Sequence, residues 1–94
     1  MAAVYDSEWY TGCISEKSLE FEDVKVNFMK RLAGTNSFSF PSRKDECWIP
    51  WDQVLCLLPV PTSTSNRGHM YIFDDEVLEY AQQQFNSFIA ANRL

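Results

Sequence analysis

The sequence predicts a mainly β protein, in which a small five-stranded antiparallel barrel is followed by a C-terminal amphipathic α-helix. Short runs of alternating apolar and polar residues follow one another without helical segments between them, which is typical of antiparallel strands. A sheet of so few strands protects its edges best by curling into a barrel. After residue 73 the apolar residues recur at helical spacing instead.

Length and composition predict one compact domain. The chain has 94 residues, of which 46% are hydrophobic, 15% aromatic and 22% charged. This is enough apolar material for one core and too little length for a second. We expect the barrel to occupy residues 1–73 and the helix residues 74–94, as parts of one domain.

The first two strands are expected before residue 29. Residues 4–14 form the first, because aromatic, small and β-branched residues alternate there. The charged stretch 15–23 predicts a turn, with Leu19 and Phe21 at the start of the second strand. The apolar positions of that second strand are Val24, Val26 and Phe28.

The middle of the chain predicts shorter strands. A loop at residues 30–37 precedes a strand around Phe38 and Phe40, which Pro41 ends because proline cannot donate to a ladder. The remaining segments are strands at 47–49 and 54–58, a tight turn between them at 51–53, an exposed connector at 59–68 and a closing segment at 70–73.

The last segment is predicted to be a helix that begins at Asp74 or Asp75, because acidic residues suit a helix N-terminus. Its apolar stripe either docks on the barrel and covers an open edge, or pairs with a partner helix or a second copy in a homodimer. The stripe contains Leu78, Ala81, Phe85, Phe88 and Ile89. The candidates for contact with a partner are Leu78, Phe85, Phe88 and Ile89.

Neither a metal site nor a cofactor is expected. Cys13, Cys47 and Cys56 are far apart, and a zinc site would require all three to converge with the single histidine, His69. We interpret the cysteines as small buried hydrophobes in a reducing compartment. The apolar stretches are too short for a membrane span and no leader is recognisable, so an intracellular protein is expected.

The chain is not expected to be an enzyme. His69 lies in a connector rich in Ser, Asn and Gly, which is typical of an exposed loop and not of a catalytic triad. Neighbouring carboxylates, such as Asp74 and Asp75, have no apolar pocket evident around them to raise a pKa. The isolated glycines cannot form a phosphate-binding loop.

Aromatic residues gather near the ends of the expected strands. Three or four aromatic faces arranged as a box attract a methylammonium group through cation–π interactions, worth roughly 0.5–2 kcal/mol per ring. The alternative is that a short barrel needs large side chains to fill its core. The candidates for such a box are Tyr5, Trp9, Tyr10, Phe28, Trp48 and Trp51.

The run YDSEWYTGCI at residues 5–14, followed by VKVNF at 24–28, resembles the opening of Tudor-type domains. In these domains an aromatic residue precedes a short acidic turn, a strand with Tyr or Trp-Tyr follows, and the next strand ends in an aromatic residue. The middle of the chain also looks like an SH3-like barrel segment of transposon-derived and other animal proteins. The resemblance implies a partly open five-stranded SH3-like barrel with an aromatic cage for methylated lysine or arginine.

Carried over by motif position, the resemblance makes Tyr5, Tyr10 and Phe28 three walls of this cage. Where the family often has a further aromatic residue, this chain has Lys30 and Arg31. The side chains that would close the box from a neighbouring strand are Trp48, Trp51 or Phe38.

The acidic balance favours a basic partner. The net charge is −5, whereas nucleic-acid affinity depends on Lys and Arg neutralising phosphates. We therefore expect a non-catalytic nuclear module, associated with chromatin, that recognises a basic peptide such as a histone tail through a methylated Lys or Arg. The residues expected to steer this peptide are Asp6, Glu8, Asp45 and Glu46.

Two alternatives remain open. One is a self-association domain of a larger nuclear or transposon-derived protein, in which every aromatic residue belongs to the core. The other is single-stranded nucleic-acid binding through stacked rings. A local basic strip for this second alternative would consist of Lys25, Lys30, Arg31, Arg43 and Lys44.

Overall fold

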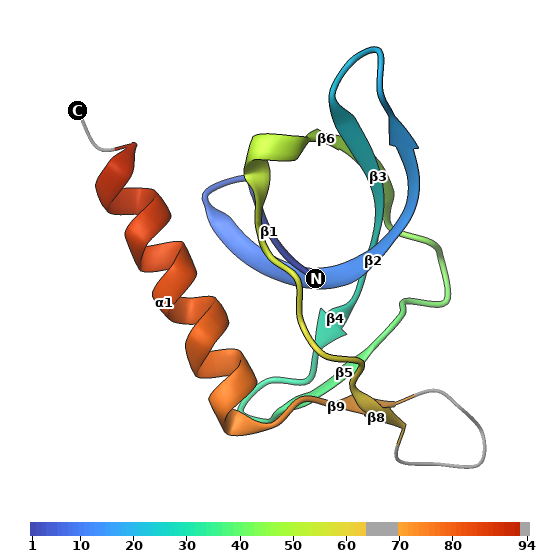
Figure 1. Ribbon diagram of the computed structural model, residues 1–94. Coiled ribbons are helices and arrows are strands. Elements are labelled where there is room, and N and C mark those ends of the chain that lie inside the picture. Colours follow the sequence, from blue (N-terminus) through green and yellow to red (C-terminus); the bar gives the residue numbers. More distant parts are fainter. Residues whose placement is uncertain (64–69, 93–94) are drawn as a thin grey trace.

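The computed structural model describes residues 1–63 and 70–92, which form two antiparallel sheets and one helix (Figure 1). The connector residue His69 therefore lies outside the described part of the chain. The elements are β1 (Ala2–Tyr5), β2 (Glu8–Ser18), β3 (Asp23–Phe28), β4 (Lys30–Arg31), β5 (Ser37–Ser39), β6 (Glu46–Pro50), the 3-10 turn η1 (Trp51–Gln53), β7 (Val54–Cys56), β8 (Thr62–Ser63), β9 (Tyr71–Ile72) and α1 (Asp75–Ala91).

The larger sheet has five strands in the order β6-β3-β2-β1-β7, and it curls strongly (Figure 1). The expected five-stranded antiparallel sheet is thus confirmed, but its closure into a barrel is not: within the described residues β6 and β7 are edge strands. β7 pairs with β1 through only Ala2 and Ala3, and the register shifts between them. The helix α1 contacts β7, so the helix lies against one of the two strands that closure would have paired.

The prediction of one strand over residues 4–14 is wrong, because a hairpin turn divides it. Tyr5 pairs with Glu8, which leaves Asp6 and Ser7 as a two-residue loop with φ of 51° and 70°. Two positive φ angles define the type I′ turn that joins twisted strands. The usual Asn-Gly or Asp-Gly signal is absent here, so the sequence pattern hides the turn.

The strand expected to start at Leu19 and Phe21 also begins later, at Asp23, and corresponds to β3. β2 continues to Ser18, and the turn before β3 contains only the residues between Ser18 and Asp23. Leu19 and Phe21 therefore lie on this turn instead of in a strand, with exposed fractions of 93% and 73%.

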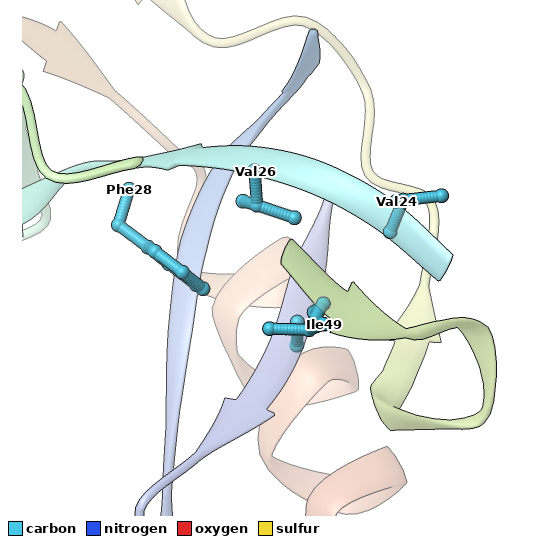
Figure 2. Close-up of a cluster of buried hydrophobic side chains, with 5 residues drawn as sticks. Val24, Val26, Phe28 and Ile49 are labelled. Atoms are coloured by element: carbon cyan, nitrogen blue, oxygen red, sulfur yellow. The ribbon is translucent and has the colours of Figure 1, made fainter. Parts of the chain in front are cut away.

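The concave face of the larger sheet carries the first core. Val24, Val26 and Phe28 lie on one face of β3, and Ile49 of β6 packs against them (Figure 2). Val24 and Ile49 are register partners, so strand pairing itself brings these side chains together. The alternation that predicted a buried face for Val24, Val26 and Phe28 is confirmed.

The second sheet, in the order β4-β5-β9-β8, was not anticipated as a separate layer. The strand expected around Phe38 is confirmed as β5, and residues 70–73, expected only as a closing segment, contain β9. These two strands pair with each other and not with the larger sheet. The larger and smaller sheets and the helix share a second core, whose buried members are Met29, Phe38, Phe73 and Leu78.

The predicted helix is confirmed, with Asp74 as its N-cap. Leu78 and Ala81 are buried, whereas Phe85 and Phe88 are half-buried and Ile89 is exposed. The helix therefore docks on its own chain through its first turns. Leu78, one of the residues proposed to face a partner, is occupied in this intramolecular contact.

Candidate functional site

Three of the predicted cage residues, Tyr5, Tyr10 and Phe28, converge. The ring centroids of Tyr5 and Phe28 lie 5.9 Å apart with an interplanar angle of 44°. Those of Tyr10 and Phe28 lie 6.0 Å apart at 74°. Phe28 is 4% exposed, whereas Tyr5 is 51% and Tyr10 40% exposed, so a buried ring supports two open ones. We call these three residues the aromatic triad.

The strand register explains this convergence. Tyr10 pairs with Ala3 and Gly12 pairs with Phe28, so that Tyr10 and Phe28 are diagonal neighbours on the same face of the sheet. Tyr5 follows Ala3 by two residues and shares this face as well. The triad therefore lies at the edge of the first core, where Phe28 belongs to the core and the two tyrosines are exposed to solvent.

Glycine at position 12 lets β2 and β3 come close beneath the triad. A Cβ built there would lie 2.7 Å from the carbonyl oxygen of Asn27 and 2.8 Å from a methyl carbon of Val26. Both distances are shorter than real Cβ contacts, and one of the atoms is backbone. Any side chain at this position would push β3, and with it Phe28, away from β2.

Three of the four predicted acidic residues lie near the triad. Asp6 is in the turn that follows Tyr5. Glu8 and Asp45 line a hollow of about 540 Å³ together with Tyr10. Asp45 is held beside the triad because its carbonyl oxygen accepts the backbone N–H of Phe28 at 2.9 Å. Lys30 and Arg31 line the same hollow, so the two carboxylates meet two basic side chains beside Tyr10.

Glu46, the fourth predicted acidic residue, is engaged elsewhere. Its carboxylate lies 3.9 Å from the Lys25 ammonium and 3.5 Å from that of Lys44. Lys25 also lies 3.9 Å from Glu16. The pairing neutralises Glu46, and it also occupies two residues of the basic strip that single-stranded nucleic acid would need.

Trp9 does not join the triad, because neighbouring residues in a strand point to opposite faces. Its indole N–H donates to the Gln82 side-chain oxygen of α1 at 2.9 Å, and the ring packs on the second core. Trp9 thus connects the helix to the larger sheet through a hydrogen bond and core packing. The sequence could have excluded Trp9 from the cage, because adjacent residues of a strand lie on opposite faces and Trp9 directly precedes Tyr10.

None of the other aromatic candidates makes a ring contact with the triad within the described residues. Phe38 is buried against Phe73, with ring centroids 5.3 Å apart. Trp48 pairs with Lys25 on the face of β6 opposite Ile49. Trp51 donates its backbone N–H to the carbonyl oxygen of Glu22, just before β3, whereas Phe28 is the last residue of that strand.

The basic residues after β3 behave differently from each other. Arg31 donates to the Thr35 carbonyl oxygen at 2.7 Å and to the Asn36 side chain at 3.3 Å, and its guanidinium lies 5.5 Å from the centre of the Phe38 ring. These contacts direct it to the second sheet. Lys30 is exposed and makes no such contacts within the described part of the chain, although both residues line the hollow beside Tyr10 together with Glu8 and Asp45.

The cysteines are not a uniform buried set. Cys13 is exposed, which corrects its interpretation as a buried hydrophobe, while Cys47 and Cys56 are half-buried. Burial raises the pKa of the Cys47 thiol, and the neighbouring Asp45 adds to this effect. Burial also raises the pKa of Cys56. Within residues 1–63 and 70–92, no group of three or more His, Cys, Asp or Glu side chains is placed to hold a metal ion.

Comparison with protein-family models, curated proteins and solved structures gave no significant match. The fold itself defines the class: a small, mainly antiparallel β domain with two sheets and one C-terminal helix. In the described part of the chain, α1 lacks the length and apolarity needed to cross a bilayer.

Sequence reasoning missed one surface altogether, a hollow beside the β2–β3 turn that Phe21 and Trp51 line. A signal was available, because Leu19 and Phe21 alternate with Glu20 and Glu22 in a stretch interpreted as a turn. Large apolar residues in a turn have no strand face to bury them.

Proposed function

We propose that the domain is a non-catalytic interaction module that binds a basic peptide through a methylated lysine or arginine held at the aromatic triad. The observation that supports this is the convergence of Tyr5, Tyr10 and Phe28 at one end of the first core. Such peptides occur in histone tails, so the proposal includes a nuclear location.

The triad has the chemistry that a methylammonium group needs. Each aromatic face carries a partial negative charge, and a cation that has lost part of its hydration shell is attracted to it. The two tyrosines stand at 44° and 74° to the Phe28 ring, so their faces are not stacked against it and remain open to a ligand. Because only three rings line the site and its fourth side is open, we expect a modest affinity for the methylated side chain.

Charges around the triad favour a basic peptide over nucleic acid. Asp6 lies in the turn after Tyr5, and Glu8 and Asp45 line the hollow beside Tyr10. Lys30 and Arg31 line this hollow too, but the Arg31 guanidinium is held by Thr35 and Asn36, which leaves Lys30 as its freely oriented basic side chain among the described residues. Acidic groups at the rim raise the association rate of a cationic partner. Phosphates would meet repulsion at the same place.

The test is calorimetric titration of the domain with histone-like peptides that carry methylated lysine or arginine. Tyr5→Ala and Tyr10→Ala should each weaken binding about 2- to 5-fold, because one exposed cation–π contact is worth about 0.5–1 kcal/mol. Trp48→Ala is the matched control, since Trp48 is 45% exposed but lies outside the triad. An equal loss in all three variants, or no loss in either tyrosine variant, would reject the proposal.

A further inference from the structure

The turn between β2 and β3 and the 3-10 turn η1 enclose a hollow of about 630 Å³. We call it the hairpin hollow. It shares no lining residue with the hollow beside Tyr10. Along β3 the two lie at opposite ends, because Asp23, the first residue of the strand, lines the hairpin hollow, and Met29, just after its last residue, lines the other. The residues that define the hairpin hollow are Leu19, Phe21, Glu22, Asp23, Trp51 and Asp52.

Large apolar side chains are exposed around the hairpin hollow. Leu19 is 93%, Phe21 73% and Trp51 49% exposed. Single exposed apolar residues are ordinary, but three around one hollow are typical of an interaction site. Neither the first nor the second core includes any of them.

Hydrogen bonds hold this apolar group in place. The backbone N–H of Trp51 donates to the Glu22 carbonyl oxygen at 2.9 Å, which ties η1 to the turn. The backbone N–H of Phe21 donates to the Ser18 hydroxyl at 3.3 Å. The hairpin hollow is therefore largely formed before a partner arrives, which lowers the entropic cost of binding.

The charges around the hollow are acidic and unpaired. Glu22, Asp23 and Asp52 line it against one basic side chain, Lys17, and none of these four makes an ion pair in the described residues. One carboxylate oxygen of Asp23, Oδ1, is buried without a hydrogen-bond donor from that part of the chain. Because one oxygen of this carboxylate lacks a donor, a cation bound beside the group would offset part of its desolvation cost.

We propose that the hairpin hollow binds a basic segment of a partner protein, in which a large apolar residue lies next to an unmodified Arg or Lys. The apolar residue packs between Phe21 and Trp51, and the cation meets the carboxylates of Asp23, Glu22 and Asp52. A second copy of this chain fits less well, because its net charge of −5 opposes an acidic surface. This site is independent of the aromatic triad.

The test uses a random 12-residue peptide library displayed on phage and selected on the whole chain. The enriched peptides should combine Arg or Lys with a large apolar residue. A synthetic peptide of the consensus sequence is then titrated against variants. Phe21→Ser and Asp23→Asn should each weaken its binding at least fivefold, whereas Tyr10→Ala should leave it unchanged. Phe21→Ser is the primary variant, because the Phe21 side chain is exposed and its replacement should leave the fold intact.

Three outcomes would overturn the proposal. The first is the absence of enrichment, or enrichment of acidic or neutral peptides. The second is a consensus peptide that Tyr10→Ala weakens and Phe21→Ser does not, which would assign the peptide to the triad. The third is a dimer of the free chain in sedimentation that Phe21→Ser dissociates, which would assign the surface to a second copy.

Discussion

Gly12 is the residue on which the geometry of the triad depends most directly. It is required for space and not for backbone conformation, because the atoms that a Cβ would meet belong to the facing strand. Its register partner is Phe28, so a displacement of β3 at this point moves the floor of the triad.

We predict that Gly12→Ala destabilises the fold by about 1–3 kcal/mol, the usual cost of overpacking a tight interior site. Chemical denaturation of the wild type and the variant measures this difference. Gly34→Ala is an informative comparison, since no atom lies within 4 Å of a Cβ there and only its positive φ of 75° opposes the substitution. Full wild-type stability of Gly12→Ala would contradict the close packing of β2 on β3.

Much of the site can be predicted at the residue scale, but not all of it. Alternation placed Phe28 on the core face, and the motif resemblance placed Tyr5 and Tyr10 beside it. The same alternation excludes Trp9, yet Trp9 was a candidate because aromatic type alone does not report direction. The surroundings of Trp48 and Trp51 depend on long-range pairing that sequence does not show.

At the scale of elements, the helix is attached through its first half. Leu78 is 6% exposed in the second core, and Trp9 donates to Gln82 one turn further on. Asn36, in the segment before β5, also donates to the carboxylate of Asp75 at the helix start. Both sheets thus hold the helix by its N-terminal turns, and its C-terminal end projects from the body (Figure 1).

We predict that Leu78→Ala costs about 2–5 kcal/mol of unfolding free energy, because it removes a buried side chain from a packed core. Ile89→Ala is the control on the same helix, and its effect should be within about 0.5 kcal/mol because Ile89 is 42% exposed. Denaturant unfolding followed by circular dichroism separates the two. Equal effects would mean that the helix does not dock through its first half.

Secondary structure was easier to predict than the layer to which each strand belongs. The helix start at Asp74 or Asp75 and the strands around Val24, Phe38 and Ile49 follow from local pattern and were found. The alternation pattern missed the turn at Asp6 and Ser7 because it lacks glycine, although the motif resemblance implies a short acidic turn there. The second sheet was missed because β5 pairs with β9, and residues more than 30 positions apart leave no periodic trace of pairing.

At the scale of the whole molecule, the open sheet separates two surfaces of different chemistry. The aromatic triad has rings supported by a core residue, and the hairpin hollow has apolar side chains among unpaired carboxylates. A net charge of −5 favours basic partners at both. Composition alone suggests the sign of the proposed partner's charge, whereas the two candidate places for it become apparent only in the fold.

Recognition of methylation by the triad can be tested with one pair of peptides. The domain is titrated with two peptides of the same basic sequence, one carrying trimethyllysine and one unmodified lysine, while the NMR resonances of the Tyr5 and Tyr10 rings are followed. We predict that the methylated peptide shifts both ring signals and that the unmodified peptide leaves them nearly unmoved. Equal shifts with both peptides, or no ring shift with either, would contradict it.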